Sequence, residues 1–194
     1  MPHLLRMTKD TPTAILDTAE RLVQQLGFNG FSYADVAAEL GVTKAGLHYH
    51  FAGKAELGEA LMKRYARRFG EALAAIDAGD QPAPEKLESY ADLYATVLND
   101  ERMCLCGMLA AEYRTLPARM QTVVVRFFDE NERWLERVLE DGRRAGTISI
   151  AGSARDAARL IVSSLEGAML VARPYADVDR FRTAARSLLA GLTA

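Results

Sequence analysis

Several features that define large protein classes are absent from this sequence. The 194-residue chain has only two cysteines, Cys104 and Cys106, and their i, i+2 spacing places them on different faces of a helix. A disulfide framework is therefore excluded. No apolar run reaches the roughly 18 residues that a membrane span needs, and the N-terminal segment lacks the apolar stretch and cleavage site of a signal peptide. We therefore expect a cytoplasmic protein.

Catalytic and metal-binding patterns are also scarce. All three histidines, His3, His48 and His50, lie in the first 50 residues, far from both cysteines in the sequence. His48 and His50 have the wrong spacing for two metal ligands on one helix face, and no glycine-rich phosphate loop occurs. A helical thiol-dependent enzyme would need a Cys-x-x-Cys pair with a neighbouring histidine. We expect no enzyme activity, no cofactor and no metal site.

The chain also lacks a strong net charge. It has 24 basic and 26 acidic residues, which gives a formal net charge of −2. Nonspecific attraction for nucleic acid therefore does not follow from overall charge. Lys63, Arg64, Arg67 and Arg68 form a local basic cluster, which is compatible either with phosphate contacts or with a solvated helix face.

Residues 31–54 carry the most informative pattern that is present. Ser32 suits the N-cap of a short helix that ends at Leu40, because its hydroxyl can accept from a free backbone N–H. Gly41 permits a sharp exit from that helix, and Thr43 can cap a second helix from Lys44 to Phe51. Two short helices joined by a tight turn predict a helix-turn-helix, in which the second helix enters the major groove of DNA.

The predicted second helix has an inner and an outer face. Leu47 and Phe51 are four residues apart and can pack inward, which leaves the polar side chains for phosphates and base edges. Lys54, at the start of the next helix, is predicted to hold another phosphate. The predicted DNA contacts are Ser32, Thr43, Lys44, Ala45, Gly46, His48, Tyr49, His50 and Lys54. The alternative is a helical hairpin with a solvated polar face.

This segment resembles the N-terminal DNA-binding domain of the TetR family of bacterial transcriptional regulators. The resemblance rests on Gly27, Phe28, Ser32, Asp35, Val36, Ala37, Gly41, Val42, Thr43, Lys44, Leu47, Tyr49, His50, Phe51, Lys54 and Leu57. Phe31, Ala45, Gly46 and His48 depart from the usual family residues, which bears on the operator sequence that is read. The resemblance implies a homodimeric repressor that binds a palindromic operator on double-stranded DNA and responds to a small-molecule effector.

The rest of the chain shows helical periodicity with Pro and Gly at the breaks, and no strand pattern competes. We therefore predict an all-α fold of about nine helices. A three-helix DNA-binding domain is expected over residues 1–54, and a helical ligand-binding and dimerisation domain over residues 55–194. The predicted helices are 12–26, 32–40, 44–51, 55–76, one beginning at 84, 104–116, 117–146, 154–173 and 178–192.

The last two predicted helices carry broad apolar stripes with several small residues, which would let another helix approach closely. TetR-like proteins dimerise through their last two helices, and a dimer could place two heads on adjacent half-sites. An ordinary intramolecular core is the alternative. The predicted dimer interface comprises Ile161, Leu165, Ala168, Met169, Phe181, Ala185, Leu188 and Leu192.

The resemblance also implies an effector pocket in the body, and large soft side chains on the central helices suit a partly apolar ligand. Glu112 and Asn131 lie in otherwise apolar stretches, so their burial would require a polar partner, which a ligand could supply. Packing in an ordinary core is the alternative for each aromatic or Met residue. The predicted pocket comprises Tyr90, Tyr94, Met103, Cys106, Met108, Glu112, Phe127, Phe128, Asn131 and Trp134.

The two cysteines support an alternative function. An oxidant or electrophile could modify Cys104 or Cys106 and so trigger release from DNA, provided that the thiol pKa is lowered. A nearby helix N-terminus and Arg102 would favour the thiolate, whereas Glu101 would oppose it. A structural role as small buried apolar groups is the competing interpretation.

Overall fold

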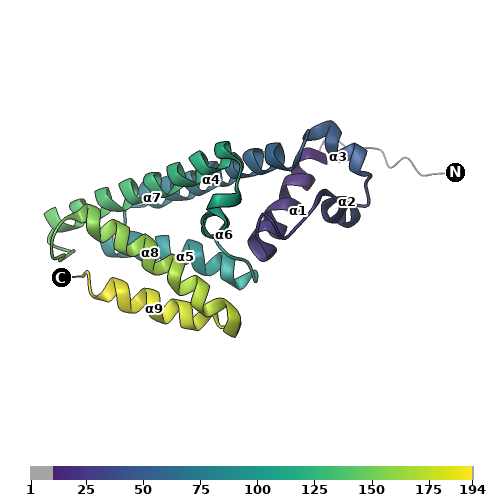
Figure 1. Cartoon of the computed structure of the whole chain (residues 1–194). Helices are drawn as coiled ribbons and strands as arrows, with labels where there is room; N and C mark the ends of the chain where they lie inside the picture. The colour runs from purple at the N-terminus through teal and green to yellow at the C-terminus, as the bar shows by residue number, and fades with distance from the viewer. Residues whose placement is uncertain (1–10, 194) are drawn as a thin grey trace.

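The described part of the chain, residues 11–193 of the computed structural model, is entirely helical apart from turns and one isolated bridge between Ile148 and Thr193 (Figure 1). The predicted all-α fold is confirmed. Residues 1–10, which fall in the predicted DNA-binding domain, lie outside the described residues. The α-helices are α1 (Thr11–Leu26), α2 (Tyr33–Leu40), α3 (Lys44–His50), α4 (Lys54–Ala78), α5 (Ala83–Asn99), α6 (Leu105–Ala111), α7 (Ala118–Arg144), α8 (Ala154–Ala172) and α9 (Val178–Ala190), with 3-10 helices η1 (Tyr113–Thr115) and η2 (Arg173–Tyr175).

Helices α1 to α3 form a compact head at one end of the molecule. Ser32 and Asp35 make a capping box that starts α2, and Gly41 ends α2 in the left-handed conformation with φ of 64°. These local signals explain why the predicted bounds of α2 and α3 lie within one residue of the observed ones. Ile15, Val36 and Leu47 are fully buried and hold the three helices together.

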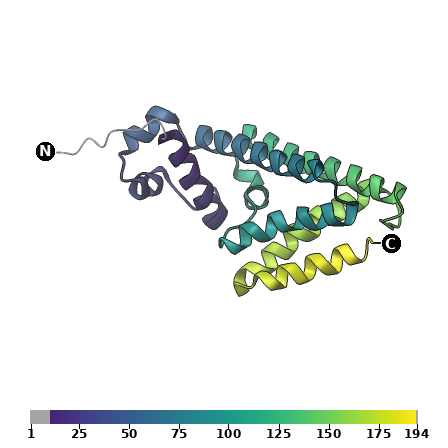
Figure 2. The ribbon, with the colours of Figure 1, turned by 180° about the vertical axis from the view of Figure 1, so that it is seen from behind.

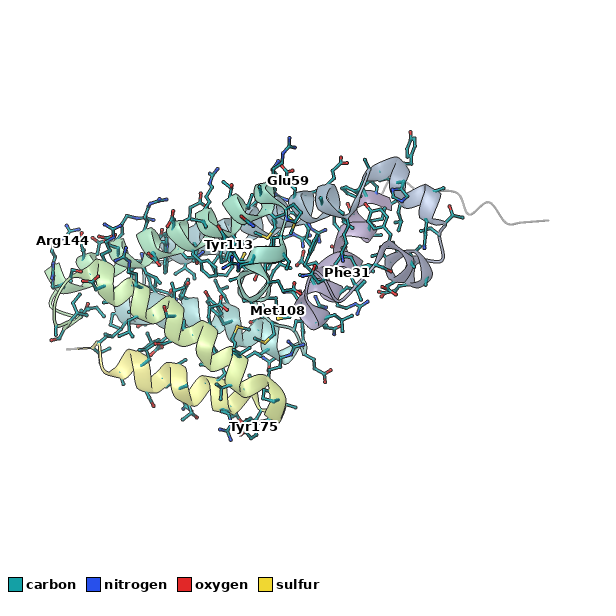
Figure 3. The ribbon with its side chains drawn as sticks, in the orientation of Figure 1. Phe31, Glu59, Met108, Tyr113, Arg144 and Tyr175 are labelled. Carbon is teal, nitrogen blue, oxygen red and sulfur yellow. The ribbon has the colours of Figure 1, made fainter. Side chains whose placement is uncertain are left out.

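Helices α4 to α9 form an elongated body (Figures 1 and 2). The long α4 leaves the head and packs along α7, and α8 and α9 lie together against α5 and α7. Phe31 lies in the head, and Arg144, at the end of α7, lies at the opposite end of the body (Figure 3). None of the described helices combines the length and apolarity needed to span a bilayer.

Helix α6 is shorter than the predicted helix over 104–116. It ends at Ala111, and the chain tightens into η1 before Leu116 takes an extended conformation with φ of −73° and ψ of 147°. Pro117 explains part of this difference, because a proline disfavours helical geometry in the residue before it. The spacing of apolar residues stays helical through residues 112–116, but the α-helical backbone hydrogen bonds end at α6.

The head is attached to the body through contacts of α1 with the first half of α4 and with the segment before α6. The Arg64 guanidinium of α4 donates to Asp17 at 2.7 Å and to Glu20 at 2.6 Å, both on α1. The backbone N–H of Met103 donates to the Gln24 carbonyl at 3.2 Å. These contacts fix the direction in which α1 leaves the body.

Gly58 of α4 provides a test of packing at this junction. A Cβ atom at Gly58 would lie 2.6 Å from Met120 Sδ and 2.7 Å from a ring carbon of Phe28. We expect Gly58→Ala to lower the free energy of unfolding by about 1–3 kcal/mol, because overpacking outweighs the gain in helix propensity. Gly70→Ala is the matched control on the same helix, since nothing lies within 4 Å of its added Cβ. Urea unfolding followed by circular dichroism should show the control unchanged or stabilised, and equal stability of both variants would contradict the described packing.

Candidate DNA-binding face and effector-binding body

Helix α3 is held rigidly on the outer part of the head. The Thr43 hydroxyl caps its first turn by accepting from Gly46 N at 3.1 Å, and Leu47 anchors its inner face. The Tyr33 hydroxyl donates to the Phe51 carbonyl at 3.0 Å, which ties the end of α3 to α2. Both views place α2 and α3 farther from the body than α1 (Figures 1 and 2).

The outer face of α3 presents most of the predicted DNA contacts to solvent. Lys44, Ala45 and His48 are exposed, and Tyr49 is 83% exposed although it is a large aromatic side chain. A large aromatic side chain that is mostly exposed is available to another molecule. These side chains are therefore free to reach a duplex.

Other predicted contacts have partners within the head. His48 Nδ1 lies 3.1 Å from the Ala52 carbonyl, and its ring centroid lies 4.8 Å from that of Tyr33. The half-buried His50 packs edge-on against Tyr49. The exposed Ser32 hydroxyl accepts from Ala34 N at 3.2 Å as the N-cap of α2. The side chains of His48, His50 and Ser32 are therefore partly occupied by contacts within the head, which limits how they can contact DNA.

Lys54 is placed differently from the predicted phosphate contact. Its ammonium donates to the Phe31 carbonyl and lies over two rings, 4.8 Å from the centroid of Phe28 and 4.4 Å from that of Phe31. Partial burial lowers the pKa of this ammonium. Lys54 joins the start of α4 to the core of the head, so part of its ammonium is engaged there, and its contact with a DNA phosphate stays a prediction.

The basic cluster on α4 is also neutralised locally. Each of its four cations lies within 4 Å of a carboxylate, so the cluster is not a free basic patch. The pairs are Lys63 with Glu59, Arg64 with Asp17 and Glu20, Arg67 with Glu71, and Arg68 with Asp17 and Glu20.

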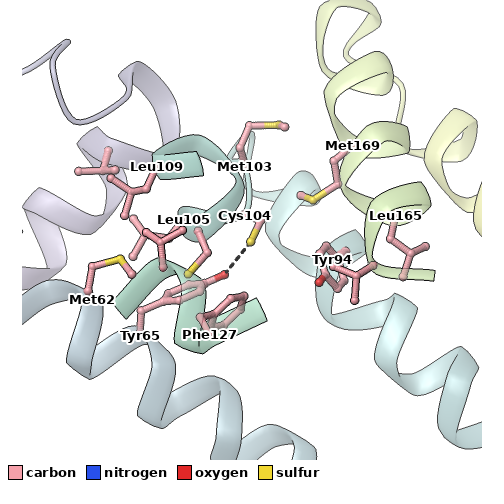
Figure 4. Close-up of a cluster of buried hydrophobic side chains, with 14 of the residues drawn as sticks. Met62, Tyr65, Tyr94, Met103, Cys104, Leu105, Leu109, Phe127, Leu165 and Met169 are labelled. Carbon is pink, nitrogen blue, oxygen red and sulfur yellow. Dashed lines mark hydrogen bonds between the residues drawn. The ribbon is translucent and has the colours of Figure 1, made fainter. Parts of the chain in front are cut away.

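The predicted aromatic lining of the body is brought together but tightly packed. Tyr90 stacks on Trp134 with ring centroids 5.6 Å apart, and Tyr94 and Phe127 contact Phe69 from two sides. Met103 and Cys106 are buried beside this cluster. Figure 4 shows the neighbouring side chains of Tyr65 on α4, Cys104 just before α6 and Met169 on α8 close together. The residues form one buried centre between α4, α5, α6, α7 and α8.

Asn131 satisfies its polar groups inside this centre. Its Oδ1 accepts from the Tyr90 hydroxyl at 3.0 Å, and its Nδ2 donates to the Phe127 carbonyl at 2.8 Å. The Tyr90 hydroxyl also lies 3.0 Å from that of Tyr94. The protein itself therefore supplies the partners that burial requires, and Asn131 needs none from a ligand in this conformation.

Glu112 lies at the head–body junction rather than in the buried centre. Its Oε2 accepts from Phe28 N at 2.6 Å, and its Oε1 accepts from Asn29 N at 3.2 Å. Gly27, with φ of 84°, makes room for the carboxylate, because a Cβ there would lie 2.8 Å from Oε1. In this conformation backbone N–H groups of the head engage the carboxylate, and its role as an effector ligand stays a prediction.

Two other residues of the predicted pocket, Met108 and Phe128, lie at the edge of the buried centre. Met108 is half-buried between the head and the α8–α9 layer, with its Sδ 3.5 Å from Arg173 Nη1 (Figure 3). Phe128 is half-buried and packs edge-on against Phe127 with centroids 5.5 Å apart.

The sequence analysis did not predict one polar residue of the buried centre, Glu166. Glu166 of α8 lies against α6, and the Cys104 thiol is within hydrogen-bond reach of its carboxyl group. Burial raises the pKa of this carboxyl to about 7. The available signal was a carboxylate between the apolar positions Leu165 and Met169, the same pattern that drew attention to Glu112.

The predicted dimer residues turn out to lie on the inner faces of α8 and α9. Ile161, Leu165, Met169, Phe181 and Ala185 are buried within the protomer. Their prediction as an interface between protomers is wrong, because α8 and α9 use this stripe to pack on each other and on the body. The remaining members, Ala168, Leu188 and Leu192, are half-buried against the same core.

The two cysteines are poor candidates for reactive thiols. Cys104 and Cys106 are both buried, and burial raises the pKa of each thiol well above its usual range. The Tyr65 hydroxyl lies 3.8 Å from Cys104 Sγ (Figure 4). Few thiolates are therefore present near neutral pH, and the thiol-sensor alternative is not favoured.

A capped, exposed recognition helix on a compact head, joined to a separate all-helical body, defines the class of one-component DNA-binding regulators. Comparison with known families agrees. The model for bacterial regulatory proteins of the tetR family matches residues 15–61, and the model for the tetracyclin repressor-like C-terminal domain matches residues 83–188. The chain belongs to the TetR family, and it is a DNA-binding transcriptional regulator rather than an enzyme.

Individual relatives support the same assignment. A TetR-family regulator from Agrobacterium tumefaciens is 31% identical, with a TM-score of 0.91 over 94% of this chain and 97% of its own. A TetR regulator from Legionella pneumophila is 30% identical, with a TM-score of 0.84 over 96% and 99%. The HTH-type transcriptional repressor NemR of Escherichia coli K12 is 24% identical over 84% of each chain.

Thiol accessibility can be tested directly. At pH 8 we expect Cys104 and Cys106 of the native protein to react with 5,5′-dithiobis(2-nitrobenzoate) at least about tenfold more slowly than in guanidinium chloride, because burial suppresses the thiolate. The absorbance of the released thiolate measures the rate, and the Cys104→Ser and Cys106→Ser variants assign it. Rapid reaction of a native thiol would restore the sensor interpretation.

Proposed function

We propose that the protein is a homodimeric cytoplasmic repressor that binds a palindromic operator and is released by a small-molecule effector. In this proposal residues 1–54 form the DNA-binding domain and residues 55–194 the effector-binding and dimerisation domain. The family assignment supports DNA and effector binding in general. The name of the related NemR supports the repressor role.

The observation that carries the proposal is the outer face of α3. Tyr49 and Lys44 project from a helix whose inner face is anchored by the buried Leu47. A rigid helix with polar and aromatic side chains on its free face suits the major groove, where side chains read base edges and clamp phosphates. We propose Thr43, Lys44, Ala45, Gly46, His48 and Tyr49 as the main contact surface, with Ser32 and His50 at its margin.

The exposed faces of α8 and α9 suit the dimer. Leu160, Leu170 and Val171 are all more than half exposed on α8, and the small Ser163 and Gly167 lie between them at helical spacing. Exposed apolar residues beside small ones favour close packing of a second helix pair. Thr183, Ala184 and Ser187 extend this exposed face on α9. Pairing through it would supply the two heads that half-sites about 34–36 Å apart, or a multiple, require.

The buried centre is the proposed effector site. Tyr90, Tyr94, Phe127 and Trp134 offer aromatic surface, and Asn131 offers an amide whose present partners are other side chains and a backbone carbonyl. A ligand that displaced the Tyr90 hydroxyl could take over its hydrogen bond. Met103, Cys106 and Phe128 complete the proposed lining, whereas Glu112 and Met108 are left out of it.

Substitutions on α3 test DNA binding. A duplex enriched from a random library by the wild-type protein serves as the operator. We expect Lys44→Ala and Tyr49→Ala each to weaken binding by about 1–3 kcal/mol at constant salt, without changing the unfolding temperature. Tyr175→Ala is the matched control for Tyr49→Ala, since Tyr175 is 61% exposed on η2 outside the head. Unchanged affinity in both α3 variants, measured by fluorescence anisotropy, would rule out this docking face.

Charge placed on α8 tests the dimer. We expect Leu160→Asp and Leu170→Asp to convert the dimer to monomer in sedimentation-velocity runs, because each would bury an unpaired carboxylate in the proposed interface. Val125→Asp is the control, since Val125 is 48% exposed on α7. Dimers that survive both α8 substitutions would place the interface elsewhere.

A further inference from the structure

The carboxyl group of Glu166 has an unusual environment within the body. Glu166 is half-buried as a residue, but its Oε1 atom is fully buried and has no hydrogen-bond partner among the described residues. Its Oε2 lies so close to α6 that a Cβ atom added to Gly107 would collide with it. The carboxylate is therefore held between α6 and α8, with one oxygen left unsatisfied.

The titratable groups that interact electrostatically with Glu166 do not supply a compensating positive charge. They are the thiols of Cys104, the N-cap residue of α6, and of Cys106 on α6, and the hydroxyls of Tyr65 on α4 and of Tyr90 and Tyr94 on α5. Burial raises the pKa of each of these groups, so all five are neutral near pH 7.

The cation of α8 nearest to this position in the sequence is committed elsewhere. Arg159 pairs with Glu132 and with Asp156, each at 3.5 Å. No described ion pair includes Glu166. A buried carboxylate usually has a cation or several donors as partners, because its desolvation is costly. Glu166 differs in this respect from Asn131, whose polar atoms are satisfied by neighbouring groups.

The same centre is rich in aromatic rings. Tyr65 lies with its ring centroid 5.8 Å from that of Phe127, and Tyr94 contacts Phe69 at 6.2 Å. Tyr65 and Tyr94 lie on two sides of Cys104, with Leu165 and Met169 of α8 next to them (Figure 4). Aromatic faces attract cations, and an adjacent carboxylate strengthens that attraction in a site without water.

We propose that Glu166 is the counter-ion of the effector, and that the effector is a small organic cation with an ammonium or quaternary nitrogen. The nitrogen would lie beside Glu166 Oε1, and the aromatic rings would receive its carbon substituents. This inference rests on the proposed effector site and adds the charge of its ligand. A neutral or anionic ligand would leave the carboxylate without a counter-charge.

Proton release gives the proposal a specific signature. Because burial raises the pKa of Glu166 to about 7, the carboxyl is partly protonated at neutral pH. A bound cation favours the ionised form and lowers this pKa. Binding near pH 7 therefore releases part of a proton, and affinity rises as the pH increases from about 6 to 8.

Calorimetric titration of the full chain tests the ligand class. The probes are two pairs in which charge is the main difference: choline with 3,3-dimethylbutan-1-ol, and benzylamine with benzyl alcohol. We expect at least one cation to bind at least tenfold more tightly than its neutral partner. Titration at pH 7 in two buffers of different ionisation enthalpy should show proton release. If neither cation is preferred over its neutral partner, the proposal is overturned.

Variants assign the preference to Glu166. Glu166→Gln should abolish both the cation preference and the proton release, whereas Glu140→Gln, at an exposed site on α7, should retain them. Gly107→Ala, which crowds Oε2, should weaken cation binding and serves as a second test if Glu166→Gln does not fold. A preference that persists in these variants would contradict the assignment.

Titration with the selected duplex separates this inference from the proposed function. If the wild-type protein binds the duplex but prefers neither cation, the inference fails and the regulator proposal stands. If the protein fails to bind any duplex, the proposed function fails whatever the cations do.

Discussion

The attachment of the head to the body governs where the DNA-binding face points. Arg64 pairs with two carboxylates of α1, and the Glu112 carboxylate accepts from the backbone N–H groups of Phe28 and Asn29. Charge-assisted hydrogen bonds of this kind have defined geometry, and Arg64 is largely shielded from solvent. Because α1 packs on α2, these contacts orient the whole head. The distance between paired heads would therefore depend on how firmly α1 is held.

Helix α6 connects this junction with the buried centre. Cys104 and Gly107, at its N-terminal end, lie against Glu166, and its C-cap residue Glu112 holds the head. A rigid helix of seven residues leaves little scope for one end to move without the other. Under the proposed function, a ligand that changed the contact between Glu166 and Gly107 would shift α6 and so the hydrogen bonds of Glu112. Energetic coupling between the sites would then pass through one short packed element.

The sequence predictions were accurate where the interactions are local in the chain, and inaccurate where residues far apart in the chain interact. The bounds of α2 and α3 were confirmed because Ser32, Gly41 and Thr43 act on backbone groups a few residues away. The partners of Lys54 and Glu112 could not be predicted, because each charge is engaged by another part of the fold, the Phe31 carbonyl and the loop after α1. The predicted dimer stripe was wrong for a related reason. Periodicity identifies the apolar face of a helix, but the more apolar face of α8 packs inside the protomer, and the exposed face carries fewer apolar residues among small ones.

By itself, the sequence determined the all-helical class, the helix-turn-helix and the family, because capping residues, turn glycines and apolar spacing are local signals. Only the tertiary structure decided which charges are free, which apolar face is exposed, and that one carboxyl oxygen of Glu166 lacks a partner. These properties depend on side chains far apart in the chain, such as Gly107 and Glu166, and on the solvent that their packing excludes. Burial and pairing are relations between elements, so spacing along one helix does not specify them.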